Sequence, residues 1–231
     1  MKNAITAALV AALLGAAAWF VLARSGPAEA PALAQVASAR HTAVLVAVED
    51  VSGLLREIEA VAKALPPAML GPAAQALDPA ARSALLGFDP LTDAGWASVG
   101  IDAKAGFGVV LDDRVVKGVQ EGASPKPMPL LLIKFSDRAK LIAAVEAKSG
   151  KKVTITAEGA LEKFVPEGEP GSFMVTKGGY TAIAVEPSKV GLEAFGADTD
   201  ALSKEAAFAT AFSSAKGAQV SMYLSLRGLV D

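Results

Sequence analysis

His41 is the only histidine in the 231-residue chain, and imidazole is the side chain best suited to acid–base chemistry near neutral pH. A hydrolase of the Ser-His-Asp type needs a serine within hydrogen-bond reach of that ring and an acid that orients it. No serine lies in a Gly-x-Ser-x-Gly turn, and the sequence neighbours of His41 supply no acid. We therefore expect His41 to be a solvated boundary residue with no catalytic role.

Asp112-Asp113 and Asp198-Thr199-Asp200 are the acidic pairs that could bind a metal ion, and Asp102 is a further turn acid. Calcium takes roughly six to eight oxygen ligands, often from a loop of about twelve residues with a central Gly and a distal Glu. Neither pair lies in such a loop. Zinc favours Cys and His ligands, which are nearly missing here. We expect solvated turn acids, no metal and no cofactor.

The glycines do not form a nucleotide-binding motif. Gly100, Gly106 and Gly108 lack the Gly-x-Gly-x-x-Gly spacing, and Lys177-Gly178-Gly179 lacks the partner glycine and the Ser or Thr of a phosphate loop. The latter segment is typical of a hairpin turn. The Trp and Phe side chains fall mostly at core-facing positions, so we expect them in the core, with an aromatic-lined pocket between sheet and helices as the alternative.

The chain has no cysteine and a net charge of −2 at pH 7. The missing thiols exclude a disulfide framework, a cysteine nucleophile, cysteine metal sites and an acylated cysteine anchor. Nucleic acid and anionic lipid are bound through clusters of Lys and Arg. The weakly acidic balance without such clusters excludes both as partners of the domain.

Residues 4–23 form an uncharged apolar run between Lys2 and Arg24. About 20 apolar residues span a bilayer as a helix, whereas a secretory signal has a shorter apolar stretch and then a small-residue cleavage site. Ala16-Ala17-Ala18 and Ala32-Leu33-Ala34 fit such a site. We expect residues 1–24 to be an uncleaved signal anchor; a cleaved signal peptide is the second interpretation and a buried core helix the third.

Residues 25–40 are rich in Pro, Ala and Ser and contain no aromatic residue, which is typical of a tether. We therefore expect one extracytoplasmic α+β domain over residues 41–231. The chain ends where a further helix should follow the last strand. A longer parent protein is one interpretation of that end, and a terminal strand that closes the sheet is the other.

Strands and helices are predicted along most of this domain. β-Branched and alternating runs predict strands over residues 42–48, 107–111, 115–119, 130–135, 153–156, 161–165, 172–176, 180–185 and 219–226. Helical periodicity and capping residues predict helices over residues 52–65, a short segment after Gly71-Pro72, 79–86, a short segment with Trp96, 137–148, 187–195 and 203–213. The three prolines of residues 121–129 predict an irregular loop.

Three segments share one layout, in which a short strand leads through a polar pair ending in Asp or Pro to a helix. They begin at Val44, Leu131 and Thr181, and a fourth begins at Val220. Each helix should pack back on the sheet that contains its strand. These units predict an α+β fold with a mixed, mainly antiparallel sheet and packed helices.

Several segments together carry a resemblance to a known group of proteins. They are the anchor, the tether, the opening TAVLVAVEDVSGLLREIEAVAKAL, the segment GFDPLTDAGWASVGIDAKAGFGVVL and the unit LLLIKFSDRAKLIAAVEA. Over most of residues 1–195 the chain resembles bacterial membrane-anchored exported proteins of unknown function. The resemblance implies an extracytoplasmic α+β domain, and it brings no catalytic residue.

Our hypothesis is a non-enzymatic cell-envelope module that acts through protein–protein or scaffold contacts, with the membrane and envelope proteins as its partners. The domain would face the periplasm, either on a single-pass anchor or released after cleavage. A carrier or sensor of a small apolar ligand is the first alternative, and a hydrolase with its site beyond Asp231 is the second. We assign no catalytic, cofactor-binding or metal-binding residue.

Overall fold

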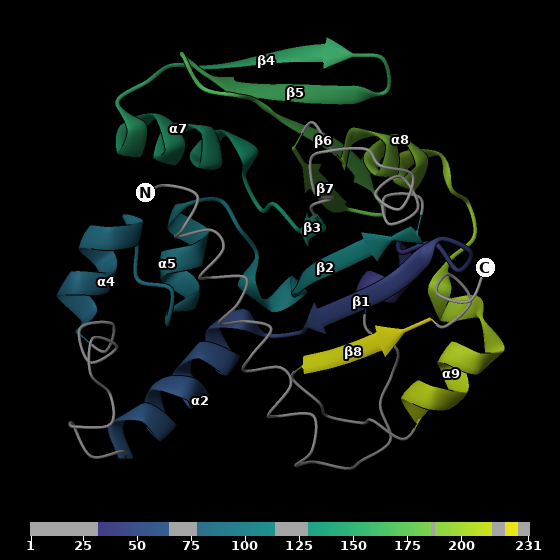
Figure 1. Cartoon of the computed structure of the whole chain (residues 1–231). Helices are drawn as coiled ribbons and strands as arrows, with labels where there is room; N and C mark the ends of the chain where they lie inside the picture. The colour runs from purple at the N-terminus through teal and green to yellow at the C-terminus, as the bar shows by residue number, and fades with distance from the viewer. Residues whose placement is uncertain (1–31, 65–77, 114–128, 186–187, 214–219, 226–231) are drawn as a thin grey trace, which may run out of the picture.

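A large antiparallel sheet forms the centre of the protein (Figure 1). The structure is a computed structural model that describes residues 32–64, 78–113, 129–185, 188–213 and 220–225. Within these residues the sheet has eight strands in the order β4-β5-β6-β7-β3-β2-β1-β8. The predicted α+β class is confirmed. The expectation of a mixed sheet is wrong, because every pair among these strands is antiparallel.

The strands follow the β-branched and alternating runs of the sequence. They are β1 (Thr42–Val48), β2 (Phe107–Asp112), β3 (Leu130–Ile133), β4 (Val153–Glu158), β5 (Leu161–Pro166), β6 (Ser172–Lys177), β7 (Tyr180–Ala184) and β8 (Val220–Leu224). As predicted, Gly178 and Gly179 form the β6–β7 turn, with φ angles of 58° and 80° that favour glycine. The strand predicted over residues 115–119 and nearly all of the predicted loop at 121–129 lie outside the described residues.

The described helices lie where helical periodicity predicts them, although the last two begin at Lys189 and Ala206 rather than at residues 187 and 203. They are α2 (Val51–Ala64), α4 (Pro79–Leu86), α5 (Asp93–Ser98), α7 (Arg138–Ser149), α8 (Lys189–Ala197) and α9 (Ala206–Ser213), with 3-10 turns η1 (Ala32–Gln35), η3 (Ala103–Ala105) and η5 (Leu202–Lys204). In α4, the Asp78 carboxylate accepts a hydrogen bond from Ala80 N, Pro79 is the first helical residue, and Gly87 ends the helix with φ 86°. The helix predicted after Gly71-Pro72 lies outside the described residues.

The three predicted strand–Asp/Pro–helix units are present as β1–α2, β3–α7 and β7–α8. In the second unit Asp137 accepts hydrogen bonds from the backbone N–H groups of Ala139 and Lys140, which fixes the start of α7. The unit that begins at Val220 continues into residues 226–231, which lie outside the described part.

Residues 33, 34 and 36–38 are buried in the core, so the tether predicted over residues 25–40 is wrong at its C-terminal end. Leu33, Ala34, Val36 and Ala37 are each 4% exposed or less. In a Pro/Ala-rich stretch, small and medium apolar residues resemble a flexible spacer. Here they fill the apolar layer on one side of the sheet. The domain therefore starts no later than Ala32 rather than at His41, and the small-residue site at 32–34 lies inside the fold.

The sheet has an apolar layer on each side. On the first side, which we call the η1 face, Leu45, Val110 and Leu132 pack in one cluster with η1, α8 and α9. On the second side, the α2 face, Val46, Val48 and Val220 pack with Val51 and Leu54 of α2, and Trp96 of α5 lies beside them. Among the described helices none is long and apolar enough to cross a bilayer, and the predicted anchor lies outside that part of the chain.

Candidate functional site

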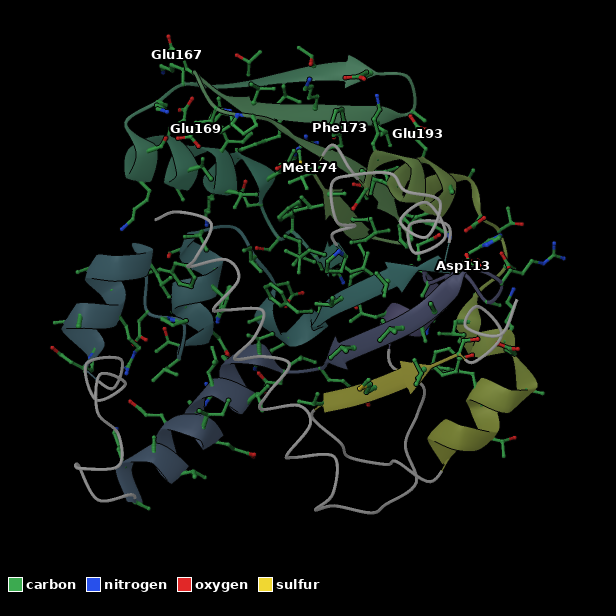
Figure 2. All side chains as sticks on the ribbon, viewed as in Figure 1. Asp113, Glu167, Glu169, Phe173, Met174 and Glu193 are labelled. Atoms are coloured by element: carbon green, nitrogen blue, oxygen red, sulfur yellow. The ribbon has the colours of Figure 1, made fainter. Side chains whose placement is uncertain are left out.

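His41 pairs with Asp113 at one end of the sheet. The two residues precede β1 and follow β2, which are neighbouring antiparallel strands. Asp113 Oδ1 lies 2.9 Å from His41 Nδ1, and Asp113 N donates to His41 O at 2.9 Å. The prediction that His41 has no acid partner is therefore wrong. An acid 72 positions away in sequence is brought to it by strand pairing. Figure 2 shows Asp113 at the end of the sheet near the loop that follows α8.

Asp200 joins this end of the sheet through a buried hydroxyl. Ser38 is 3% exposed. Its Oγ accepts a hydrogen bond from His41 N at 3.3 Å and donates to Asp200 Oδ1 at 3.4 Å. Arg40 N donates to the other oxygen of the Asp200 carboxylate at 3.1 Å. Residues that looked unrelated in the sequence thus form one polar cluster, consisting of Ser38, Arg40, His41, Asp113 and Asp200.

A shallow, open depression of about 300 Å³ adjoins the cluster. Its lining residues are Ala39, Arg40, Asp200, Ala201, Lys204 and Glu205. Close to Asp200, the Lys177 ammonium donates to Phe195 O at 3.3 Å. Burial lowers the pKa of Lys177, and the negative charges of Asp198 and Asp200 counter part of that shift.

The cluster contains a base and an orienting acid but no arranged nucleophile among the described residues. A carboxylate at Nδ1 leaves Nε2 of the imidazole as the atom that would move a proton. Ser38 Oγ bonds the backbone of His41 rather than its ring, and it is already committed to Asp200. The geometry therefore fits a structural role, in which these polar contacts close the end of the β1–β2 ladder and hold residues 38–41 against the loop around Asp200.

The other acids singled out in the sequence lie elsewhere. Asp112 is 3% exposed and lies in β2, where it pairs in register with Thr42 at a bulge in β1, so the expectation of a solvated turn acid is wrong for this residue. Asp102 caps η3, where its carboxylate accepts from the backbone of Lys104 and Ala105 at 3.2 Å. No group of three or more His, Cys, Asp or Glu residues in the described ranges is placed to hold a metal ion.

The glycines and aromatic residues have structural roles in the described part of the chain. Gly108 lies beneath Leu33, and a methyl group there would be 3.1 Å from Leu33 Cδ1. Trp96 packs between Phe88 and Phe107, with ring centroids 4.8 and 5.2 Å away, and its indole N–H donates to Pro90 O. Phe173, Phe195 and Phe208 are at most 2% exposed and fill the η1-face core. The prediction of core positions is confirmed for these three residues, whereas other described aromatic residues are half-buried: Phe88, Trp96, Phe107, Phe135 and Phe164.

The α2 face carries an apolar surface that sequence analysis missed. In direct cross-strand register, its side chains run from β8 through β1, β2 and β3 to β7: Met222, Val46, Val109, Leu131 and Ile183. A shorter second row is Leu224, Val44 and Leu111. Met222 is 51% exposed, Leu224 49% and Leu131 36%, whereas Val46 of the first row is buried at 5% and packs against α2. We call these two rows the apolar surface.

The strand period was the signal that could have revealed this surface. The continuous apolar run of β1 gives it two apolar faces, but it could not show that the described helices cover only part of the second face. Comparisons of the chain with protein-family models, with curated proteins and with solved structures find no match.

Proposed function

We propose that this protein is a membrane-anchored module of the cell envelope that binds a protein partner through the apolar surface on its α2 face. The observation that carries the proposal is the exposure of three large apolar side chains on one face of the sheet, Met222 and Leu224 on β8 and Leu131 on β3. Soluble domains rarely leave large apolar side chains grouped on their surface, and such groups mark interaction sites.

The shape of the surface supports a protein rather than a small molecule. Pockets for small ligands are concave and enclose most of the ligand. The apolar surface is instead a stretch of pleated sheet, so its contacts suit a broad partner. A partner would also cover the half-buried neighbours Val44, Val109 and Leu111. Each Å² of apolar surface that the partner buries favours association by about 25 cal/mol.

The anchor remains part of the proposal, with residues 4–23 as the membrane-spanning helix and the domain in the periplasm. The polar cluster at His41 has no role in chemistry in this proposal; it fixes the junction between residues 38–41 and the sheet. A carrier of an apolar ligand and a hydrolase with its site beyond Asp231 remain the two alternative functions.

Site-specific photo-crosslinking in living cells tests the proposal. A benzoyl-phenylalanine at position 222 should give a discrete adduct larger than a dimer of this chain. The same residue at Glu193, an exposed position on α8 that Figure 2 labels, is the matched control and should not give it. Asp in place of Leu131 should abolish the adduct, because a buried unpaired charge opposes association.

Equal adducts from positions 222 and 193 would show that the contacts are not specific to the apolar surface. No adduct at position 222, with normal amounts of protein, would overturn the proposal.

A further inference from the structure

The edge strand β4 lacks the features that normally keep sheet edges apart. It is the outermost strand in Figure 1, and no other strand of the described sheet lies beyond it. Thr154, Ile155, Thr156 and Ala157 are all exposed. Edge strands are usually protected by a central Lys, a Pro, a bulge or an inward-pointing charge. These four residues carry no charge and no proline, and the β4–β5 register is unbroken.

The hairpin register shows which backbone groups face outward. Gly159 and Ala160 form a two-residue turn, so Glu158 and Leu161 are the hydrogen-bonded pair next to it. Bonding alternates from there, which leaves the N–H and C=O groups of Val153, Ile155 and Ala157 on the free edge. The outward Val153 N–H confirms this pattern, since it donates to the Glu146 carboxylate of α7 at 2.9 Å.

The sequence of this edge is complementary to itself. If two copies of β4 run antiparallel with Ile155 opposite Ile155, Thr154 faces Thr156 and Val153 faces Ala157 across the pair. In the same register Lys152 of each copy faces Glu158 of the other. Opposite charges, β-branched pairs and threonine pairs directly across an antiparallel ladder each stabilise it.

We infer that two copies of this chain associate through their β4 edges, antiparallel and centred on Ile155, so that the two sheets join into one. The outward groups of Ile155 bond each other reciprocally. Ala157 N–H donates to Val153 C=O of the other copy, while Val153 N–H keeps its bond to Glu146. Glu158 already forms an ion pair with Lys189, and the two side chains are 42% and 24% exposed. The exposed part of the Glu158 carboxylate forms a second ion pair, with Lys152 of the other copy.

An edge-to-edge pair of this length buries less area than the roughly 1,600 Å² of a standard interface, so the dimer is weak and dilution dissociates it. The pairing does not involve the apolar surface on the α2 face. β4 lies at the opposite edge of the sheet from β8, which carries Met222. A dimer and a partner on the α2 face are therefore compatible.

The test is sedimentation equilibrium of the full chain in mild detergent over a wide range of concentrations. Wild type should show a reversible monomer–dimer equilibrium. Ile155→Lys should be monomeric, because it places two ammonium groups opposite each other at the symmetry axis. Met222→Lys introduces the same charge at an exposed site on the other edge strand, and it should dimerise as wild type does.

A charge swap tests the register itself. Lys152→Glu alone and Glu158→Lys alone should each weaken the dimer, because each places like charges opposite each other. Mixing the two single variants should restore it, since the new carboxylate at position 152 of one chain then faces the new ammonium at position 158 of the other. Circular dichroism of each variant checks that it is folded.

Because the chain has no cysteine, Ile155→Cys provides an independent readout. This variant should form a disulfide-linked dimer on mild oxidation, and Met222→Cys should do so far less. A wild type that stays monomeric at every concentration would overturn the inference. So would a dimer that survives Ile155→Lys and is lost with Met222→Lys, because association would then use the β8 edge.

Discussion

Leu33→Ala tests whether the segment before β1 is core or tether. The side chain is 2% exposed, and both of its methyl groups contact the space above Gly108. The substitution removes three carbons from the core, worth about 2.4 kcal/mol at about 0.8 kcal/mol per buried methylene. The remaining cavity raises the expected loss to about 2–5 kcal/mol. If Leu33 were instead solvated in a tether, the same substitution would change the free energy of unfolding by no more than about 0.5 kcal/mol.

Urea unfolding followed by circular dichroism measures this difference, with exposed Gln35→Ala as the control. Gly108→Ala supplies a second, matched measurement, because its methyl group would lie 3.1 Å from Leu33 Cδ1 and 3.2 Å from Leu132 Cβ. The double variant Leu33→Ala/Gly108→Ala should be more stable than the two single losses add up to, since the new methyl group enters the vacated space. Additive losses, or a Leu33→Ala loss below about 0.5 kcal/mol, would refute the packing of η1 on the sheet.

Three further predictions test individual contacts. His41→Ala should lower the free energy of unfolding by about 1 kcal/mol or less, because the hydrogen bond between His41 and Asp113 is partly exposed. Urea unfolding at neutral pH measures this loss, and an unchanged free energy of unfolding would contradict the His41–Asp113 contact. Tyr180→Phe should cost about 1 kcal/mol at neutral pH through its lost bond to Ala105 O. Burial raises the Tyr180 pKa above 10.0, so this hydroxyl's contribution is complete below pH 10 and is lost as pH rises through the folded pKa. Stability measured from pH 8 to pH 11 should show the two proteins converging, and a constant gap would contradict it. Gly178→Ala should cost more than Gly179→Ala in thermal melts, because both have positive φ but only Gly178 faces Val36, 2.5 Å from the added methyl; equal costs would contradict that contact.

Local signals predicted the elements and their ends well. Asp78, Pro79 and Gly87 act on the few residues beside them, so their sequence order alone placed α4. The same is true of Asp137 at the start of α7 and of the glycines in the β6–β7 turn. Capping and turn chemistry depend on short-range geometry, which a sequence displays directly.

Long-range packing could not be predicted in this way. Leu33 and Ala34 have no periodic neighbours, and Leu33 packs against a glycine of β2, so composition alone indicated a tether. The His41–Asp113 pair depends on the β1–β2 pairing, which joins residues 72 positions apart. The antiparallel order, and the part of the α2 face that the described helices leave exposed, likewise depend on which strands meet. None of these follows from a local pattern.

The proposed membrane-anchored envelope module is tested most directly by a reporter that is active only outside the cytoplasm, fused after Asp231. We predict an active reporter that stays in the membrane fraction after high-salt and alkaline washes. Leu13→Arg with Leu14→Arg should abolish both export and membrane retention, because a charge at a helix centre costs about 2.5–3.5 kcal/mol on insertion scales. An inactive fusion beside an active cytoplasmic reporter at the same position would contradict the location, and with it the envelope function.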